Sequence, residues 1–393
     1  MMQLLREPEA VEELGIGRVR DHFSNTLFPG TSSLQHHAKY FVVLPWIYYN
    51  AINSKERFKD RAAVDAYIRQ EEVRLTWRLA MTGPGDGITG KSFVEDYDDP
   101  DKIDYKKYVK YDPTYIYSSG MFRYGIVSDS NIERLIMTLN ARNHGELTEE
   151  SEDRKGFSDD LKTCGIDYGR DSKEPLSLAL NEMEAKFLKD KIVSRCQDTL
   201  LEKLIESGRR MPVSYFDAGT PEKGGIDLDQ FGEMAQVYRQ SVLFSQFVLL
   251  LDWRYNYVYY KVFHDIYKDE KYLELAEACE RAYQEHLSKI RPLDEYEKMF
   301  DDIESIDPKL TDFFRRCYPC IADGSQSAME KLDMLVRERE KEVKKSRKKI
   351  GNRAYRDKKR GNPLPITYRW MTVRTIVNEI SEALNPQSQE LNG

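Results

Sequence analysis

The chain has 393 residues, of which 40% are hydrophobic and 32% are charged, and its formal net charge is −7. This length predicts two or three domains, and the hydrophobic share excludes a wholly disordered protein. No apolar run reaches the roughly 18 residues that a membrane span needs. The first residues lack the apolar core of a signal peptide, and the five cysteines are scattered. We therefore expect a cytoplasmic protein with reduced thiols and no membrane partner.

Residues 1–145 predict an N-terminal helical domain. Residues 34–51 are apolar and aromatic, and Pro45 interrupts them, which predicts a buried helix that is kinked or broken at this proline. Residues 60–82 place apolar side chains at helical spacing, with arginine and glutamate on the opposite face. Two more helices are expected over residues 113–124 and 130–140.

An acidic stretch that is poor in apolar residues, 146–175, predicts an exposed linker to a second helical domain over 176–390. No alternation typical of β-strands and no long repeat is present. We predict a mostly α fold of two helical domains or lobes, with a long basic helix near the C-terminus. Helices of the second domain are expected over residues 176–207, 230–268, 271–290, 294–316, 325–360 and 366–384.

The charge of the chain is unevenly distributed. From Arg337 to Arg360 there are 13 lysines and arginines but only four acidic residues, a local net charge of +9 that leaves −16 for the rest. Such a block predicts an anionic partner, although a solvated charged helix face is the usual alternative. If apolar side chains dock one face of this helix, the exposed candidates for binding nucleic acid are Lys344, Lys345, Arg347, Lys348, Lys349 and Arg353.

A second basic set occurs near the N-terminus. It flanks a predicted helix start that serine and threonine residues can cap, and the N-terminus of a helix itself favours anions. The set contains Arg18, Arg20, His36, His37 and Lys39, of which Arg18, Arg20 and Lys39 are the candidate nucleic-acid contacts.

Several motifs of enzymes and metal sites occur without the context they need. Residues 85–92, GDGITGKS, formally fit a phosphate-binding loop, and residues 247–252, FVLLLD, fit the partner strand that holds its metal ion. Such a loop follows a buried strand and opens a helix. Here a helical pattern precedes it, and an acidic segment that Pro100 interrupts follows. An NTPase therefore remains only an alternative.

The other motifs are equally incomplete. Cys317 and Cys320 form a single CxxC pair, whereas a structural zinc site needs four ligands. Neighbouring aspartates occur three times without the sheet scaffold of a metal-dependent nuclease. Asp252, Arg254 and Asn256 lie in the most apolar segment, which predicts a buried polar network or, less simply, a site. We assign no catalytic residue, no metal ligand and no cofactor.

Residues 13–48 resemble the opening block of a bacterial family of unknown function, with the pattern ELGIGxIRD, then LFPGTSxxQ, then PWIY. Similar segments follow in the same order, including DPTYIYSSGMFRYGI at 112–126 and RYNYVYYKVF at 254–263, so the resemblance covers nearly the whole chain. The family usually carries arginine where this chain has His36, His37 and Lys39. The resemblance implies a genomic association with helicases, phospholipase-D-like nucleases and modification genes in prokaryotic antiviral defence islands.

Together these observations favour a non-catalytic nucleic-acid-binding or scaffold subunit of an antiviral defence or DNA-processing complex. DNA is the favoured nucleic acid, and a helicase or nuclease is the expected protein partner. Two alternatives stay open. The first is an enzyme, either a P-loop-like NTPase at residues 85–92 or a metal-dependent nuclease. The second is a structural adaptor whose basic helix binds an acidic protein.

Overall fold

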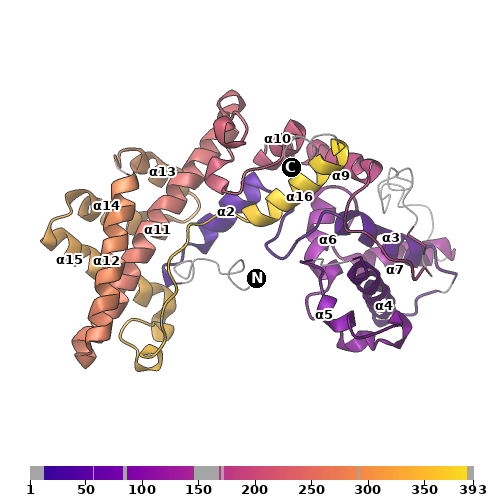
Figure 1. Cartoon of the computed structure of the whole chain (residues 1–393), viewed down its shortest axis with the longest axis horizontal. Helices are drawn as coiled ribbons and strands as arrows, with labels where there is room; N and C mark the ends of the chain where they lie inside the picture. The colour runs from indigo at the N-terminus through magenta and orange to yellow at the C-terminus, as the bar shows by residue number, and fades with distance from the viewer. Residues whose placement is uncertain are drawn as a thin grey trace. The chain divides into compact units, whose positions relative to one another are not determined.

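The computed structural model describes residues 13–55, 57–82, 86–145, 168–169, 172–290 and 292–386 (Figure 1). Every regular element among these residues is a helix, which confirms the predicted mostly α fold. None of these helices combines the length and the apolar character that crossing a membrane requires.

The chain folds into two compact units, each assembled from segments that are far apart in sequence. Unit 1 contains residues 1–26 and 229–368, and unit 2 contains residues 27–228 and 369–393. The predicted acidic linker, 146–175, lies largely outside the described residues, so that boundary stays a prediction. The first described residues thus belong to the same unit as the basic block near the C-terminus.

Unit 1 is built around one long helix, α11 (Gly232–Tyr267), against which α12 (Glu270–Ile290) packs. The predicted helix or helix pair over 230–268 is therefore a single helix. Aromatic rings fill the core, with Phe247 and Phe314 at a centroid distance of 4.9 Å. Where the structure describes this unit, its α-helices also include α13 (Glu295–Glu304), α14 (Pro308–Asp323), α15 (Gln326–Lys344) and all of α2 (Gly17–Leu27) except its last residue.

The predicted helix over 325–360 is wrong in its second half, because α15 ends at Lys344. Lys345 has a φ of 52° and a ψ of −117°, which takes the backbone out of the helical conformation. A continued helix would stack Lys344 on Lys348 and Lys345 on Lys349, and like charges four residues apart destabilise a helix. Instead the chain forms short 3-10 turns over 345–347 and 353–355.

Unit 2 is organised around α3 (Tyr40–Ile52), which contacts α4 (Arg61–Ala80), α6 (Pro113–Arg123) and α7 (Ile132–Asn143). The helix α3 is buried as predicted, and it runs through Pro45 without a break. Further α-helices of this unit within the described ranges are α5 (Lys91–Val94), α9 (Glu182–Arg195), α10 (Leu200–Ser207) and α16 (Trp370–Leu384).

Candidate nucleic-acid interface

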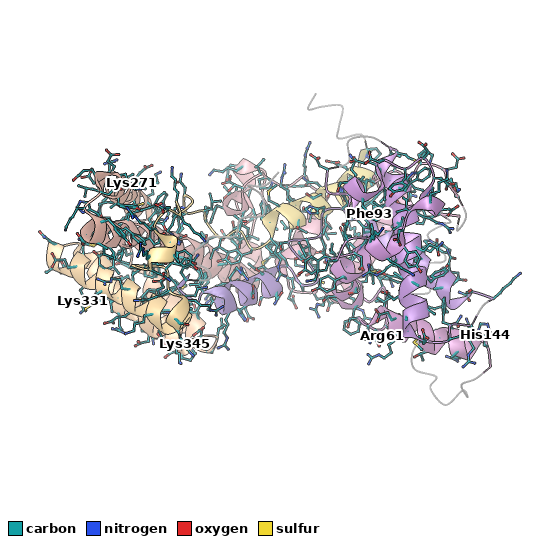
Figure 2. All side chains as sticks on the ribbon, turned by 90° about the horizontal axis from the view of Figure 1, so that it is seen from below. Arg61, Phe93, His144, Lys271, Lys331 and Lys345 are labelled. Carbon is teal, nitrogen blue, oxygen red and sulfur yellow. The ribbon has the colours of Figure 1, made fainter. Side chains whose placement is uncertain are left out.

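The segment that follows α15 presents most of the basic block at the surface of unit 1. We call residues 345–360 the basic loop, and Figure 2 shows Lys345 at the edge of this unit. The loop has little regular structure of its own, so its backbone needs hydrogen-bond partners from elsewhere. Buried side chains of three helices supply them.

Glu340 of α15 is the first of these anchors. Its side chain is 1% exposed. One carboxylate oxygen accepts hydrogen bonds from the backbone N–H of Lys349 at 2.6 Å and from the hydroxyl of Tyr255 at 2.6 Å. The other oxygen accepts from the N–H of Ile350 at 3.2 Å. The carboxylate thus turns the loop back onto the helix that it has just left, and Ile350 becomes buried.

Tyrosines of α11 and α12 hold the rest of the loop. The hydroxyl of Tyr259 donates to the carbonyls of Tyr355 at 2.7 Å and Lys358 at 3.2 Å. The hydroxyl of Tyr272 donates to the carbonyl of Arg356 at 2.8 Å, and that of Tyr260 accepts from the N–H of Arg360 at 2.9 Å. The tyrosine-rich segment of α11 therefore acts as a scaffold for the basic loop.

Two cations of the loop point inward and are neutralised there. Lys349 forms an ion pair with Glu13, which is 1% exposed. The guanidinium group of Arg360 lies 3.9 Å from Glu13 and 4.0 Å from Asp252, and it stacks 4.5 Å from the ring centre of Tyr255. The buried carboxylate of Glu13 must be paired in this way, so Lys349, whose side chain is 28% exposed, is engaged within unit 1. Its role as a nucleic-acid contact stays a prediction.

The predicted buried polar network of α11 is also present. Asn256 donates to the carbonyl of Gly361 at 3.2 Å and accepts from Arg360. Arg254 forms ion pairs with Glu280 and Asp333. This network connects α11 to other helices and to the basic loop. It therefore matches the predicted buried polar network of Asp252, Arg254 and Asn256 rather than a catalytic site.

Six other cations of the loop remain exposed, and Asp357 is the loop's single acidic residue. Among the described residues, Lys349 and Arg360 are the only cations of the loop in ion pairs with a carboxylate. Lys344, which precedes the loop, is half-buried and already interacts within the chain. The exposed set contains Lys345, Arg347, Lys348, Arg353, Lys358 and Lys359.

The predicted N-terminal contacts have different environments. Arg18 is exposed on α2, whereas Arg20 is partly buried and pairs with Asp21 at 2.7 Å. Lys39 is 5% exposed, and its ammonium lies 2.8 Å from both carboxylate oxygens of Glu184. We correct its predicted role: this lysine is a buried structural cation, because its charge is compensated within unit 2.

The histidine pair is structural as well. His37 lies 2.6 Å from a carboxylate oxygen of Glu379 through Nδ1 and 2.7 Å from the carbonyl of Asp86 through Nε2. Burial alone would lower its pKa, but the hydrogen bond and charge of Glu379 outweigh burial and raise it. His36 packs against Gly87. Sequence reasoning could not find Glu379, because it lies 342 residues away.

The phosphate-binding motif does not have the geometry of an NTPase. Gly85 lies outside the described residues. The motif follows α4, a helix rather than a strand, and its last two residues begin the four-residue helix α5. Within the motif, the carbonyl of Thr89 accepts hydrogen bonds from Thr76 at 3.2 Å and Tyr108 at 3.1 Å. Lys91 lies 3.5 Å from Glu95. The loop therefore packs on its own unit instead of forming an open cradle.

Metal ligands do not converge in the described part of the chain, where no group of three or more His, Cys, Asp or Glu residues could hold an ion. Cys317 and Cys320 are buried on α14. Burial raises the pKa of the Cys317 thiol well above its usual value, so the thiolate that binds metals is disfavoured there.

The comparisons with known proteins address the N-terminal half of the chain. No curated protein and no solved structure matches the sequence. A family model matches residues 1–217, which include Arg18 and Arg20 but not the basic loop. That model describes a family of unknown function, DUF6361, and it covers more than half of the chain. The chain belongs to the DUF6361 family.

Proposed function

We propose that the protein is a non-catalytic nucleic-acid-binding subunit of a prokaryotic antiviral defence or DNA-processing complex. The observation that carries this proposal is the set of six exposed cations on the basic loop, none of which pairs with a carboxylate of the described residues. Clustered cations that meet phosphates release condensed counterions, and this release drives binding to DNA or RNA.

The anchoring of the loop supports this function. Glu340 and the tyrosines of α11 and α12 fix the backbone of the loop. Binding therefore costs less conformational entropy than it would for a flexible segment. Contacts of this kind read the phosphate backbone rather than the bases, which predicts affinity with little sequence preference. DNA is the favoured ligand, and Arg18 can add a contact from the same unit.

The place of the protein in a complex is proposed from its resemblance to genes of defence islands. A helicase or nuclease is the expected partner, and it would supply the chemistry of the complex. The chain outside residues 337–360, with its net charge of −16, would repel nucleic acid and restrict it to the basic segment.

The test is binding of labelled duplex DNA, single-stranded DNA and RNA to the purified full chain by fluorescence anisotropy at low salt. One variant replaces Lys345, Arg347, Lys348 and Arg353 by glutamate. The matched control makes four equal charge changes at exposed lysines elsewhere in unit 1, namely Lys268, Lys298, Lys309 and Lys331.

We expect the loop variant to bind much more weakly at low salt and the control to keep most of its affinity. If both variants lose the same affinity, the loss follows from net charge alone, and this result would contradict a defined interface at the basic loop. Absence of binding by the unaltered protein would exclude nucleic acid as the ligand, and the basic loop would then be a docking surface for an acidic protein.

A further inference from the structure

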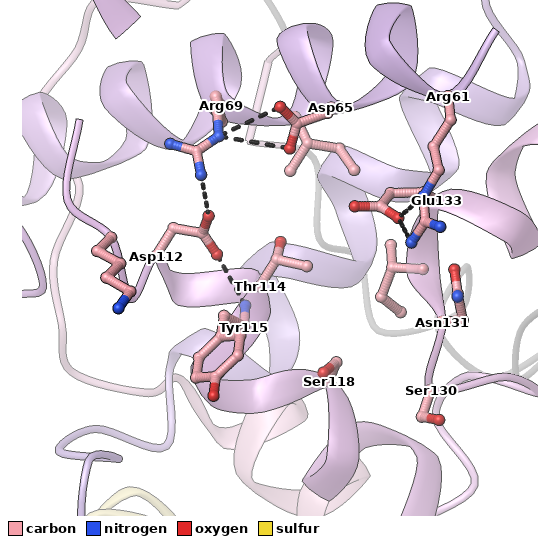
Figure 3. A pocket seen from close by; sticks show the side chains of 13 residues that line it. Arg61, Asp65, Arg69, Asp112, Thr114, Tyr115, Ser118, Ser130, Asn131 and Glu133 are labelled. Carbon is pink, nitrogen blue, oxygen red and sulfur yellow. Dashed lines mark hydrogen bonds and ion pairs between the residues drawn. The ribbon is translucent and has the colours of Figure 1, made fainter. Parts of the chain in front are cut away.

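Unit 2 contains a cavity that the basic loop does not share. It has a volume of about 420 Å³ and lies among the N-terminal half of α4, the start of α6 and the start of α7 (Figure 3). This size falls within the roughly 300–1,000 Å³ of small-molecule sites.

Ion pairs hold the walls of the cavity in place. The guanidinium group of Arg69 lies 3.3 Å from Asp65 on its own helix and 3.2 Å from Asp112 at the start of α6. Arg61 pairs with Glu133 of α7, so the second wall is also tied to α4. Figure 3 shows the contacts of Arg69 at one side of the cavity and the contact between Arg61 and Glu133 at another. The cavity is therefore formed before any ligand arrives.

Polar groups of the lining are left without partners in the described part of the chain. The side-chain carbonyl of Asn131 accepts from the N–H of Arg134 at 3.0 Å, which leaves its amide N–H₂ available. The hydroxyls of Ser118 and Ser130 also line the cavity and form no hydrogen bond within the described residues. Beside them the buried side chains of Ile68 and Ile132 give an apolar floor.

An exposed aromatic ring stands at the rim. Tyr115 lines the cavity and is 62% exposed, and the ring of Tyr111 supports it at a centroid distance of 5.1 Å. The ammonium of Lys110, another lining residue, lies 5.3 Å from the ring centre of Tyr111. Tyr115 therefore presents an aromatic ring on which a planar ligand can stack.

We propose that this cavity binds a nucleoside phosphate, either as a free mononucleotide or as one unstacked nucleotide of a single strand. The base would stack on the ring of Tyr115. Stacking of bases on aromatic side chains contributes much of the affinity of proteins that bind single strands. The hydroxyls and the Asn131 amide would hydrogen-bond the edge of the base, and Lys110 would meet the phosphate. The proposal goes beyond the interface at the basic loop, because it uses other residues in the other unit.

The test is isothermal titration calorimetry of the full chain with AMP, GMP, CMP and UMP, and anisotropy with short homopolymeric single strands. Ser118→Phe fills the cavity, and Tyr115→Ala removes the stacking ring. Phe122→Ala is the matched control, because Phe122 is 51% exposed on the same helix but does not line the cavity. Thermal unfolding of each variant checks that the fold is kept.

We expect Ser118→Phe to abolish binding, Tyr115→Ala to weaken it about tenfold, and Phe122→Ala to leave it unchanged. If mononucleotides bind and the variants change their affinity in this way, the ligand is a free nucleotide. If only the single strands bind and show these changes, the ligand is one nucleotide of a strand. Absence of binding to every probe, or equal losses in Phe122→Ala, would overturn the proposal. Loss of mononucleotide binding on reversing the charges of the basic loop would also overturn it, because those residues lie outside the cavity.

Discussion

Replacing Glu340 should release the basic loop from α15. In Glu340→Ala, the N–H groups of Lys349 and Ile350 and the hydroxyl of Tyr255 lose their acceptor in a buried site. A buried donor without a partner costs about 1–3 kcal/mol, so three such donors cost about 3–5 kcal/mol if the loop partly relaxes. Glu340→Gln keeps one acceptor oxygen and should cost about 1–2 kcal/mol.

Hydrogen exchange of peptides that cover residues 345–356 measures this effect locally, which avoids assuming that two units unfold together. A loss of about 3–5 kcal/mol predicts that these amides exchange about a hundredfold to several thousandfold faster. The control is Glu338→Ala, because Glu338 is exposed on the same helix and pairs with the exposed Arg316 at 3.3 Å. Its substitution should change exchange little. Unchanged exchange in Glu340→Ala would refute the anchoring role of the carboxylate.

Three further predictions concern unit 2. Because Glu379 raises the pKa of His37 above 6.5, this pair stabilises the fold fully below about pH 6.5 and less as the pH rises through the raised pKa. The difference in melting temperature between the unaltered protein and Glu379→Gln should therefore shrink from about pH 6 to about pH 9, and a constant difference would contradict the pairing. Lys39→Met leaves the buried carboxylate of Glu184 without its cation and should lower the free energy of unfolding by about 3–5 kcal/mol in urea titrations; a change below about 1 kcal/mol would refute the buried pair. Asp60→Ala removes the cap of α4 and should cost about 1 kcal/mol, whereas Asp60→Asn should cost clearly less.

Local signals allowed much of the fold to be predicted from the sequence. The expected helix over 60–82 is α4, Arg61–Ala80, because the spacing of its apolar residues is a local feature. The expected helix over 271–290 is α12, Glu270–Ile290, for the same reason. The mostly α fold followed from such patterns alone.

The candidate site could be predicted only in part. The surplus of lysines and arginines indicated where an anion could bind. Whether each of these side chains is exposed, however, depends on acidic partners that are distant in sequence. Lys39 is buried by Glu184, and Lys349 is neutralised by Glu13, more than 300 residues earlier. The end of α15 at Lys344 likewise depends on how Glu340 folds the chain back. Neither periodicity nor charge counting contains that information.

The salt dependence of DNA affinity tests the proposed interface most directly. Each phosphate contact contributes about −0.9 to the slope of log affinity against log salt concentration for duplex DNA. If the basic loop binds the phosphate backbone, reversing Lys345, Arg347, Lys348 and Arg353 flattens the slope by about three to four, while the control at Lys268, Lys298, Lys309 and Lys331 keeps the original slope. Identical slopes in the unaltered protein and the loop variant would contradict the proposal that this loop is the nucleic-acid interface.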